Sequence, residues 1–421
     1  MKTLDPKPDT FAPAGLRGWR LRFPSPLPLA TPAVASGRVF VGGGYGSHAF
    51  YALDAATGRE LWTLHTKDDG PTAAVAVDGF VAFNTESCTL YVVEAETGKV
   101  AWERWLGDPL MAQPAADLER VYMAYPARGG EHRLAAFELR TGKPVWEAPI
   151  GHDIVTAPVL DGGKVYVSTY DGFVRRFDAA SGAAEWSKDY RATSAPWIAG
   201  EEVLVSTREE GVEAPREGLH SFRAATGGRH ASLHAAKSAH YLRPRRGSHE
   251  AALHDAYDAS VGFSAAPAAA KLDKVEALTG EYRVYGGWRY QGSRPVTSGG
   301  HCYSIAGDEI ERVETDSHRR SWKKKPTTDE SGSRGLHPPA VCNGKLFLTT
   351  SDGRLRCLKE EDGEELWQVE VGKPMEWSPA VASGRVFAGT VDGELLCVET
   401  GDPADDGWPM WGGGPGHNGH S

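Results

Sequence analysis

A tryptophan that follows a glycine by four residues recurs along this chain, and the repeat constrains the fold more than any other feature. The first unit runs from Tyr51 through Asp54 and Gly58 to Trp62. Later units have Glu94, Gly98 and Trp102; Glu138, Gly142 and Trp146; Asp178, Gly182 and Trp186; and Gly363 and Trp367. The first four tryptophans are 40, 44 and 40 residues apart, which is the length of one four-stranded blade of a β-propeller.

Each unit has the residues of a strand, a tight turn and a second strand. The apolar run at residues 50–53 suits a strand that is buried on both faces. The acid that follows accepts hydrogen bonds from turn amides, and the glycine supplies a positive φ without steric cost. The tryptophan fills the gap against the neighbouring blade, where its indole N–H needs an acceptor. We therefore interpret these acids, glycines and tryptophans, together with Trp322 and Trp19, as structural repeat residues.

The number of units predicts an all-β, eight-bladed propeller of four-stranded antiparallel blades that forms a single domain over residues 1–421. Eight segments begin an innermost strand, near Pro32, Thr72, Pro114, Pro158, Pro196, Pro295, Pro339 and Pro379. The eighth unit lacks its fourth strand, and residues 18–23, which include Trp19, are predicted to supply it, so that both chain ends close the ring. The alternative is that Trp408 or Trp411 supplies this strand. We otherwise expect the segment from Trp408 onward to run extended along the last blade.

Two units depart from the repeat. The fifth has Ala231 where the tryptophan is expected, and the sixth has Trp322 but lacks the glycine. Between these blades the spacing from Pro196 to Pro295 is 99 residues, which predicts an insertion at residues 231–288 or, alternatively, a degenerate ninth blade. Its histidines at positions 249 and 254 have a spacing of five, whereas a zinc-binding helix needs four, so no metal site is predicted.

The composition excludes several classes of partner and location. The net charge of −10 indicates no nucleic-acid partner, since such proteins present a basic face. No run of 18 apolar residues predicts a transmembrane segment. The sequence begins without a secretory signal, so we expect a cytoplasmic protein as written, or an exported one if the N-terminus has been processed or replaced. The five cysteines are odd in number, which favours free thiols in a reducing compartment.

The unit Ala-x-Asp-x-x-Thr-Gly-x-x-x-Trp, seen at residues 52–62, resembles two sets of PQQ-like, quinoprotein-type bacterial propellers. One set comprises the quinoprotein dehydrogenases, and the other the non-catalytic propellers of the outer-membrane assembly lipoprotein family. The first resemblance implies PQQ with calcium in the central channel, adjacent cysteines and often a C-x-x-C-H haem motif. This chain has neither cysteine motif, so the resemblance favours the non-catalytic set and no cofactor.

The lengths of the connections suggest where a partner binds. If the strands of a blade are lettered A to D from the axis outward, the C–D turns are uniformly short. The B–C loops are long at residues 43–48, 126–132 and 209–217. The insertion joins strand D to the next strand A, hence lies on the same face as these loops. We predict a non-enzymatic scaffold, monomeric by itself, that binds a protein or peptide through this face. The alternatives are a PQQ- and calcium-dependent dehydrogenase, and a binder of a carbohydrate or other small molecule at the channel mouth. No catalytic or cofactor-binding residue is identified.

Overall fold

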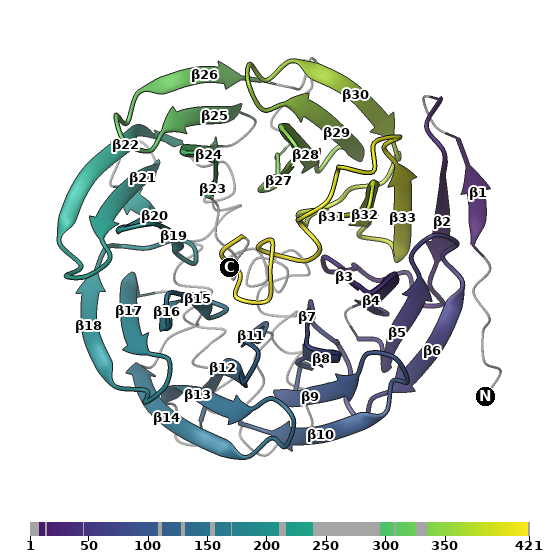
Figure 1. The fold of residues 1–421 in the computed structure, drawn as a ribbon, viewed down its shortest axis with the longest axis horizontal. Helices are drawn as coiled ribbons and strands as arrows, with labels where there is room; N and C mark the ends of the chain where they lie inside the picture. The colour runs from purple at the N-terminus through teal and green to yellow at the C-terminus, as the bar shows by residue number, and fades with distance from the viewer. Residues whose placement is uncertain are drawn as a thin grey trace, which may run out of the picture.

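The computed structural model describes residues 8–12, 15–44, 46–107, 112–127, 131–151, 156–169, 171–209, 216–238, 295–306, 309–325 and 335–419. Within these residues the chain forms eight antiparallel sheets arranged as a ring around a central axis (Figure 1). All its named regular elements are β-strands. The predicted eight-bladed propeller is therefore confirmed. The described part of the chain contains no helix with the length and apolar character needed to cross a membrane.

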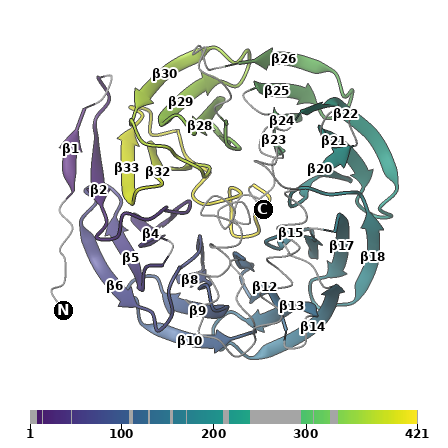
Figure 2. The same ribbon diagram turned by 180° about the vertical axis from the view of Figure 1, so that it is seen from behind.

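Each blade is a meander whose strands A to D follow one another from the axis to the rim (Figures 1 and 2). Blades 1 and 2 comprise β3 (Ala33–Ala35), β4 (Arg38–Gly42), β5 (Ala49–Asp54), β6 (Glu60–His65), β7 (Val75–Val77), β8 (Phe80–Phe83), β9 (Thr89–Glu94) and β10 (Val100–Trp105). Blades 3 and 4 comprise β11 (Ala115–Ala116), β12 (Arg120–Pro126), β13 (His132–Glu138), β14 (Pro144–Gly151), β15 (Val159–Asp161), β16 (Lys164–Ser168), β17 (Phe173–Asp178) and β18 (Ala184–Asp189).

The second half of the ring repeats the same order. Blades 5 and 6 comprise β19 (Trp197–Ala199), β20 (Glu202–Glu209), β21 (Arg216–Arg223), β22 (Arg229–Ser238), β23 (Val296–Ser298), β24 (His301–Ala306), β25 (Glu309–Glu314) and β26 (Arg320–Lys324). Blade 7 comprises β27 (Ala340–Cys342), β28 (Lys345–Thr349), β29 (Arg354–Lys359) and β30 (Glu365–Glu370), and blade 8 begins with β31 (Ala380–Ala382), β32 (Arg385–Gly389) and β33 (Glu394–Glu399).

The two ends of the chain close the ring in blade 8. The N-terminal strand β2 (Gly18–Arg22) pairs antiparallel with β33, from Gly18 opposite Val398 to Arg22 opposite Glu394. This confirms the predicted closure, and the alternative that Trp408 or Trp411 supplies the fourth strand is wrong. A further strand, β1 (Asp9–Phe11), which was not predicted, pairs with the outer side of β2 (Figure 1).

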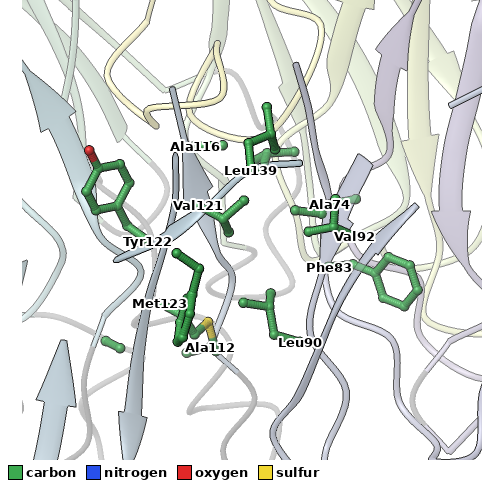
Figure 3. Close-up of a cluster of buried hydrophobic side chains, with 14 of the residues drawn as sticks. Ala74, Phe83, Leu90, Val92, Ala112, Ala116, Val121, Tyr122, Met123 and Leu139 are labelled. Carbon is green, nitrogen blue, oxygen red and sulfur yellow. The ribbon is translucent and has the colours of Figure 1, made fainter. Parts of the chain in front are cut away.

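The core lies between neighbouring blades, because both faces of the inner strands are covered. Figure 3 shows this packing where blade 2 meets blade 3. Leu90 and Val92 of β9 and Val121 and Met123 of β12 are fully buried members of one apolar cluster. The continuous apolar runs of the B and C strands follow from this double burial.

A tryptophan joins each of several blades to the next. The Trp102 indole donates to the carbonyl of Leu139 at 2.8 Å. Its ring lies against Gly142, whose φ is +67° and where a Cβ would come within 2.5 Å of the indole Cδ2. The same indole-to-carbonyl bond joins Trp19 to Ala55, Trp62 to Ala95, Trp146 to Ala179, Trp186 to Ala224 and Trp322 to Glu360. The ring also lies on the facing glycine for Trp19 on Gly58, Trp62 on Gly98, Trp146 on Gly182 and Trp322 on Gly363.

The two irregular units belong to one interface. Ala231 lies opposite Ser221 in β22, as Trp62 lies opposite Ala52 in blade 1. The facing turn of blade 6 has His318, with a φ of +55°, at the glycine position, and its amide donates to Glu314 as that of Gly58 does to Asp54. A side chain at this position excludes an indole, so both halves of the contact have been replaced together.

Part of the segment that the sequence assigns to the insertion, residues 231–288, belongs to blade 5. Residues 231–238, which the repeat spacing assigns to the insertion, continue strand β22. The stretch from 239 to 294 lies outside the described residues, and the proposed degenerate blade and the histidines at 249 and 254 lie there too. Strand β23 resumes the regular pattern at Val296.

The indole contact predicts that a methyl group on the glycine beneath the tryptophan ring lowers the free energy of unfolding. Gly142→Ala should lower the free energy of unfolding by about 1–3 kcal/mol more than Gly163→Ala. Gly163 has a similar φ of +73°, but no atom lies within 4 Å of the place that a Cβ would take, so its variant carries only the backbone cost of a left-handed residue. Urea unfolding of both variants measures the difference. Equal destabilisation would mean that the glycine serves the turn and not the tryptophan.

Candidate functional site

The face that carries the A–B and C–D turns, called here the turn face, has C–D turns of one length in blades 1 to 7. The repeat acids lie in its C–D turns. Asp54 accepts hydrogen bonds from the amide and hydroxyl of Thr57, at 2.8 and 2.7 Å. Asp178 accepts the same pair from Ser181, and these bonds, with Lys164, lower the pKa of Asp178 to about 2. Glu94 and Glu138 each accept from the hydroxyl of the turn threonine. These acids hold turns, and no reacting group converges on them.

The opposite face, which carries the B–C loops and D–A connections, is called the loop face and is uneven. Strand β20 has 8 residues and β16 has 5. Both pair with strand A in the same register from the turn face. The three additional residues therefore extend β20 by about 10 Å at the loop face. The B, C and D strands of blade 3 are also longer than those of blade 4, so blade 4 ends in a notch between two taller neighbours.

A basic side chain lies at the loop end of blade 4. The Arg175 guanidinium lies 5.0 Å from the ring centroid of Phe173 and donates to the hydroxyl of Thr169 at 2.6 Å. Burial lowers the pKa of Arg175 from its usual value. Asp171, four residues before Arg175, and Arg191, whose backbone lies beside Gly172, are exposed. This cluster offers charge and an aromatic face to a partner, features typical of interfaces.

Three carboxylates gather on the loop face between blades 1 and 2. Glu86 is 1% exposed, and burial, with the nearby charge of Asp69, raises the pKa of Glu86 to about 9. Its side chain packs on Gly70, where a Cβ would lie 2.3 Å from the Glu86 Cγ. Asp68 is held by the amide of Ser87 at 2.7 Å. In the described residues no group of three or more His, Cys, Asp or Glu has the arrangement of a metal site.

The C-terminal tail, residues 400–419, fills part of the central channel. Figures 1 and 2 show this segment in yellow leaving blade 8 and turning inside the ring. Five amides of inner strands donate to it: Val34 to the Pro409 carbonyl, Ala116 to Pro415, Leu160 to Gly416, Val381 to Trp408 and Ile198 to the Asn418 side chain. The distances range from 2.6 to 2.8 Å. The expectation of a tail that runs along the last blade is therefore wrong, because the tail pairs with five blades.

Side chains fix the tail in the channel. The Trp408 ring stacks on Trp197 with centroids 5.8 Å apart and planes 5° from parallel. The Asn418 amide donates to the carbonyl of Ile198 at 3.0 Å while accepting from its N–H. His417 Nδ1 lies 3.0 Å from the carbonyl of Pro158, and burial lowers the pKa of His417 to about 4. The imidazole is therefore neutral near pH 7, so it donates this bond through Nδ1–H.

A separate polar contact holds the base of the tail. Lys345 Nζ lies 2.8 Å from Asp402 and 2.7 Å from Asp405, and the Asn343 amide donates to both carboxylates. Asp405 is completely buried. We call this contact the latch. A buried charge that keeps its partner is stable, whereas removal of Lys345 leaves two carboxylates without compensation.

Beside the tail a small hollow, partly open to solvent and with room for roughly one water molecule, remains on the axis. Its lining combines apolar and aromatic side chains with the polar Ser378 and His417: Val159, Ala195, Trp197, Val296, Pro338, Pro339, Ser378, Trp408, Trp411, Gly412 and His417. None of these residues carries charge near neutral pH. Neither this hollow nor Glu86 was predicted from the sequence, because nothing in their local patterns marks them.

All five cysteines are buried thiols. Burial raises the pKa of Cys302 and Cys357 to about 12. A thiol that stays protonated at neutral pH is a poor nucleophile, so these side chains serve as packing groups in the inner strands.

Comparisons with known proteins agree on the fold. The profile of one family, described as outer membrane protein assembly factor BamB, matches residues 10–232 and 306–408. The structure is similar to BamB from Moraxella catarrhalis, with a TM-score of 0.58 and 14% identity over 90% of this chain and 96% of that chain. It is also similar to Sqt1 from Saccharomyces cerevisiae, with a TM-score of 0.60 and 12% identity over 90% of this chain and 97% of that chain. For the quinohemoprotein alcohol dehydrogenase ADHIIG from Pseudomonas putida HK5 the TM-score is 0.58 and the identity 14%, over 92% of this chain and 76% of that chain. No curated protein sequence matches.

The raised pKa of Glu86 predicts a pH dependence of stability. The folded carboxyl is protonated up to about pH 9, whereas in the unfolded chain it ionises near the ordinary glutamate value of 4.5. The contribution of the Glu86 carboxyl to the free energy of unfolding is therefore full below about pH 4.5 and is lost as the pH rises toward 9. Glu86→Gln should therefore raise the melting temperature at pH 8.5 by a few degrees, on the order expected for about 1–2 kcal/mol. At pH 5 the difference should shrink. Glu96→Gln, at an exposed turn position, is the control, and an equal gain at both pH values would contradict the assignment.

Proposed function

This chain belongs to the family described as outer membrane protein assembly factor BamB, and we propose that it is a non-enzymatic scaffold that binds a protein or peptide partner through its loop face. The observation that carries the proposal is the difference between the two faces. The turn face repeats the same short turns, while the loop face has longer strands, the partly buried Arg175 and the buried Glu86. Such variation on a rigid ring is where binding surfaces arise.

The proposal extends to the partner's position. The notch over blade 4, which the longer strands of blades 3 and 5 flank, is the place that we propose for a segment of the partner. A partner with an acidic group can pair with Arg175, whose guanidinium is already half desolvated against Phe173. A charge that has lost part of its hydration before binding gives a stronger contact than one at the open surface.

A quinone cofactor in the channel is the alternative that the family resemblance raises, and the residues there do not fit it. PQQ is an acid that needs cationic partners, and a calcium ion needs carboxylate or carbonyl oxygens. The hollow on the axis is lined by uncharged side chains, and the tail takes up hydrogen-bonding groups of five inner strands. We therefore propose that the channel binds no such cofactor.

Site-specific crosslinking tests the assignment of the binding face. A photoreactive residue at Asp171 or Arg191, both exposed on the loop face, should capture the same partner in cells. The matched positions on the turn face, Glu96 and Arg140, should capture none. Arg175→Glu should reduce the crosslink at Asp171 at least about tenfold. Capture from the turn face alone would overturn the proposal.

Calorimetric titration tests the alternative directly. Addition of PQQ with calcium should give no heat of binding and no change in melting temperature, because the uncharged hollow offers no partner to its carboxylates. The same titration without calcium is the control. Stoichiometric, calcium-dependent binding at micromolar affinity would replace the scaffold with an oxidoreductase.

A further inference from the structure

The inner edge of the ring is a repeated set of hydrogen-bonding groups. In five blades the residue of strand A that bonds the tail lies opposite a valine of strand B. These residues are Val34, Ala116, Leu160, Ile198 and Val381. The N–H groups at these positions point to the axis and bond the tail. An unpaired strand edge of this kind is a template for another chain. The tail thus occupies a site that recognises peptide backbone.

The tail has the features of a preformed ligand. Within it, Gly419 donates to the carbonyl of Gly412 at 2.7 Å and His417 to that of Gly414 at 2.9 Å, so it is a compact loop closed by its own bonds. Its glycines allow close approach: a Cβ on Gly416 would lie 3.0 Å from the Leu160 Cβ, and one on Gly419 3.2 Å from Trp197. A ligand that is ordered before binding loses less entropy on docking.

The tail leaves part of the site unfilled. The equivalent inner positions of blades 2, 6 and 7 are Ala76, Thr297 and Val341, and the tail's backbone hydrogen bonds to inner strands, within the described residues, are to other blades. The hollow lined by Val296, Pro338 and Pro339 adjoins blades 6 and 7. The tail therefore leaves the inner edges of these three blades for another segment. The latch attaches the base of the tail, Asp402 and Asp405, to Lys345 of blade 7.

From these observations we propose that the inner edges of the blades form a peptide-binding site, that residues 402–419 are its intramolecular ligand, and that a partner segment of the same chemistry displaces them. That chemistry is a Trp-Pro pair, whose ring stacks on Trp197 and whose carbonyls accept from inner strands, followed by a glycine-rich loop that ends in an asparagine. This site is distinct from the loop face, so it does not depend on the function proposed above.

Exchange of a cleaved tail tests the proposal. A recognition sequence for a specific protease is inserted after Gly401, an exposed residue where a Cβ would meet no atom within 4 Å. After cleavage the tail should stay bound through size-exclusion chromatography. A fluorescent synthetic peptide of residues 402–419, added in excess, should then replace it at one site per ring, while uncleaved protein takes up much less of the peptide.

Two variants make the experiment specific. A peptide with Trp408→Ala and Asn418→Ala should bind at least about tenfold more weakly, because it lacks the stacked ring and the paired amide. Lys345→Gln in the ring should speed exchange of the unchanged peptide about tenfold, because it weakens the latch alone. Circular dichroism is followed in parallel. Unfolding on cleavage, uptake only at denaturant concentrations that unfold the ring, or equal binding of the altered peptide would each overturn the proposal and make the tail a fixed part of the core.

Discussion

The ring depends on an indole that lies on a backbone with no side chain. At the interface of blades 2 and 3, Trp102 covers Gly142 and bonds the carbonyl of Leu139. The glycine is required twice over, first for its positive φ and then for the absence of a Cβ beneath the ring. The contact therefore couples a turn in one blade to a strand in the previous one. At the interface of blades 5 and 6, where Ala231 takes the place of the tryptophan, His318 takes the place of the glycine, so both members of the contact differ together.

A ring built in this way joins its two chain ends in one blade, but it leaves eight inner strand edges at the axis. In this protein five of those edges bond the tail. The tail thereby pairs with strand edges at the inside of the ring, as β2 pairs with the edge of β33 where the ring closes. Both pairings use segments that lie outside the regular repeat. The two differ in the number of hydrogen bonds: β2 forms a continuous ladder from Gly18 to Arg22, while the tail makes one or two bonds to the inner strand of each of five separate blades.

The sequence predicted what the repeat specifies. Trp62, Gly98 and their equivalents are spaced by one blade, so the count of blades, the strand order and the role of residues 18–23 follow from local pattern. The path of the tail does not, because Trp408 to Asn418 has neither the period of a strand nor that of a helix, and its partners belong to five different blades. The relation of Ala231 to His318 was hidden for a similar reason. Each was visible as an irregularity, but only the order of blades in space makes them neighbours.

What occupies the axis decides what a propeller of this kind can do. The inner strands here present Val159, Trp197 and Val296 to the hollow beside the tail, and none of these residues can neutralise a carboxylate or hold a metal ion. The inner amides of five blades are polar groups at the axis, and in this structure they bond the tail. A ring with apolar inner side chains and hydrogen-bonding inner edges is therefore suited to peptides at its centre, as its uneven loop face is suited to a partner at its surface. Inner strand edges at the axis and variable loops on the loop face are both suited to binding another chain. Both therefore agree with a binding role for this ring.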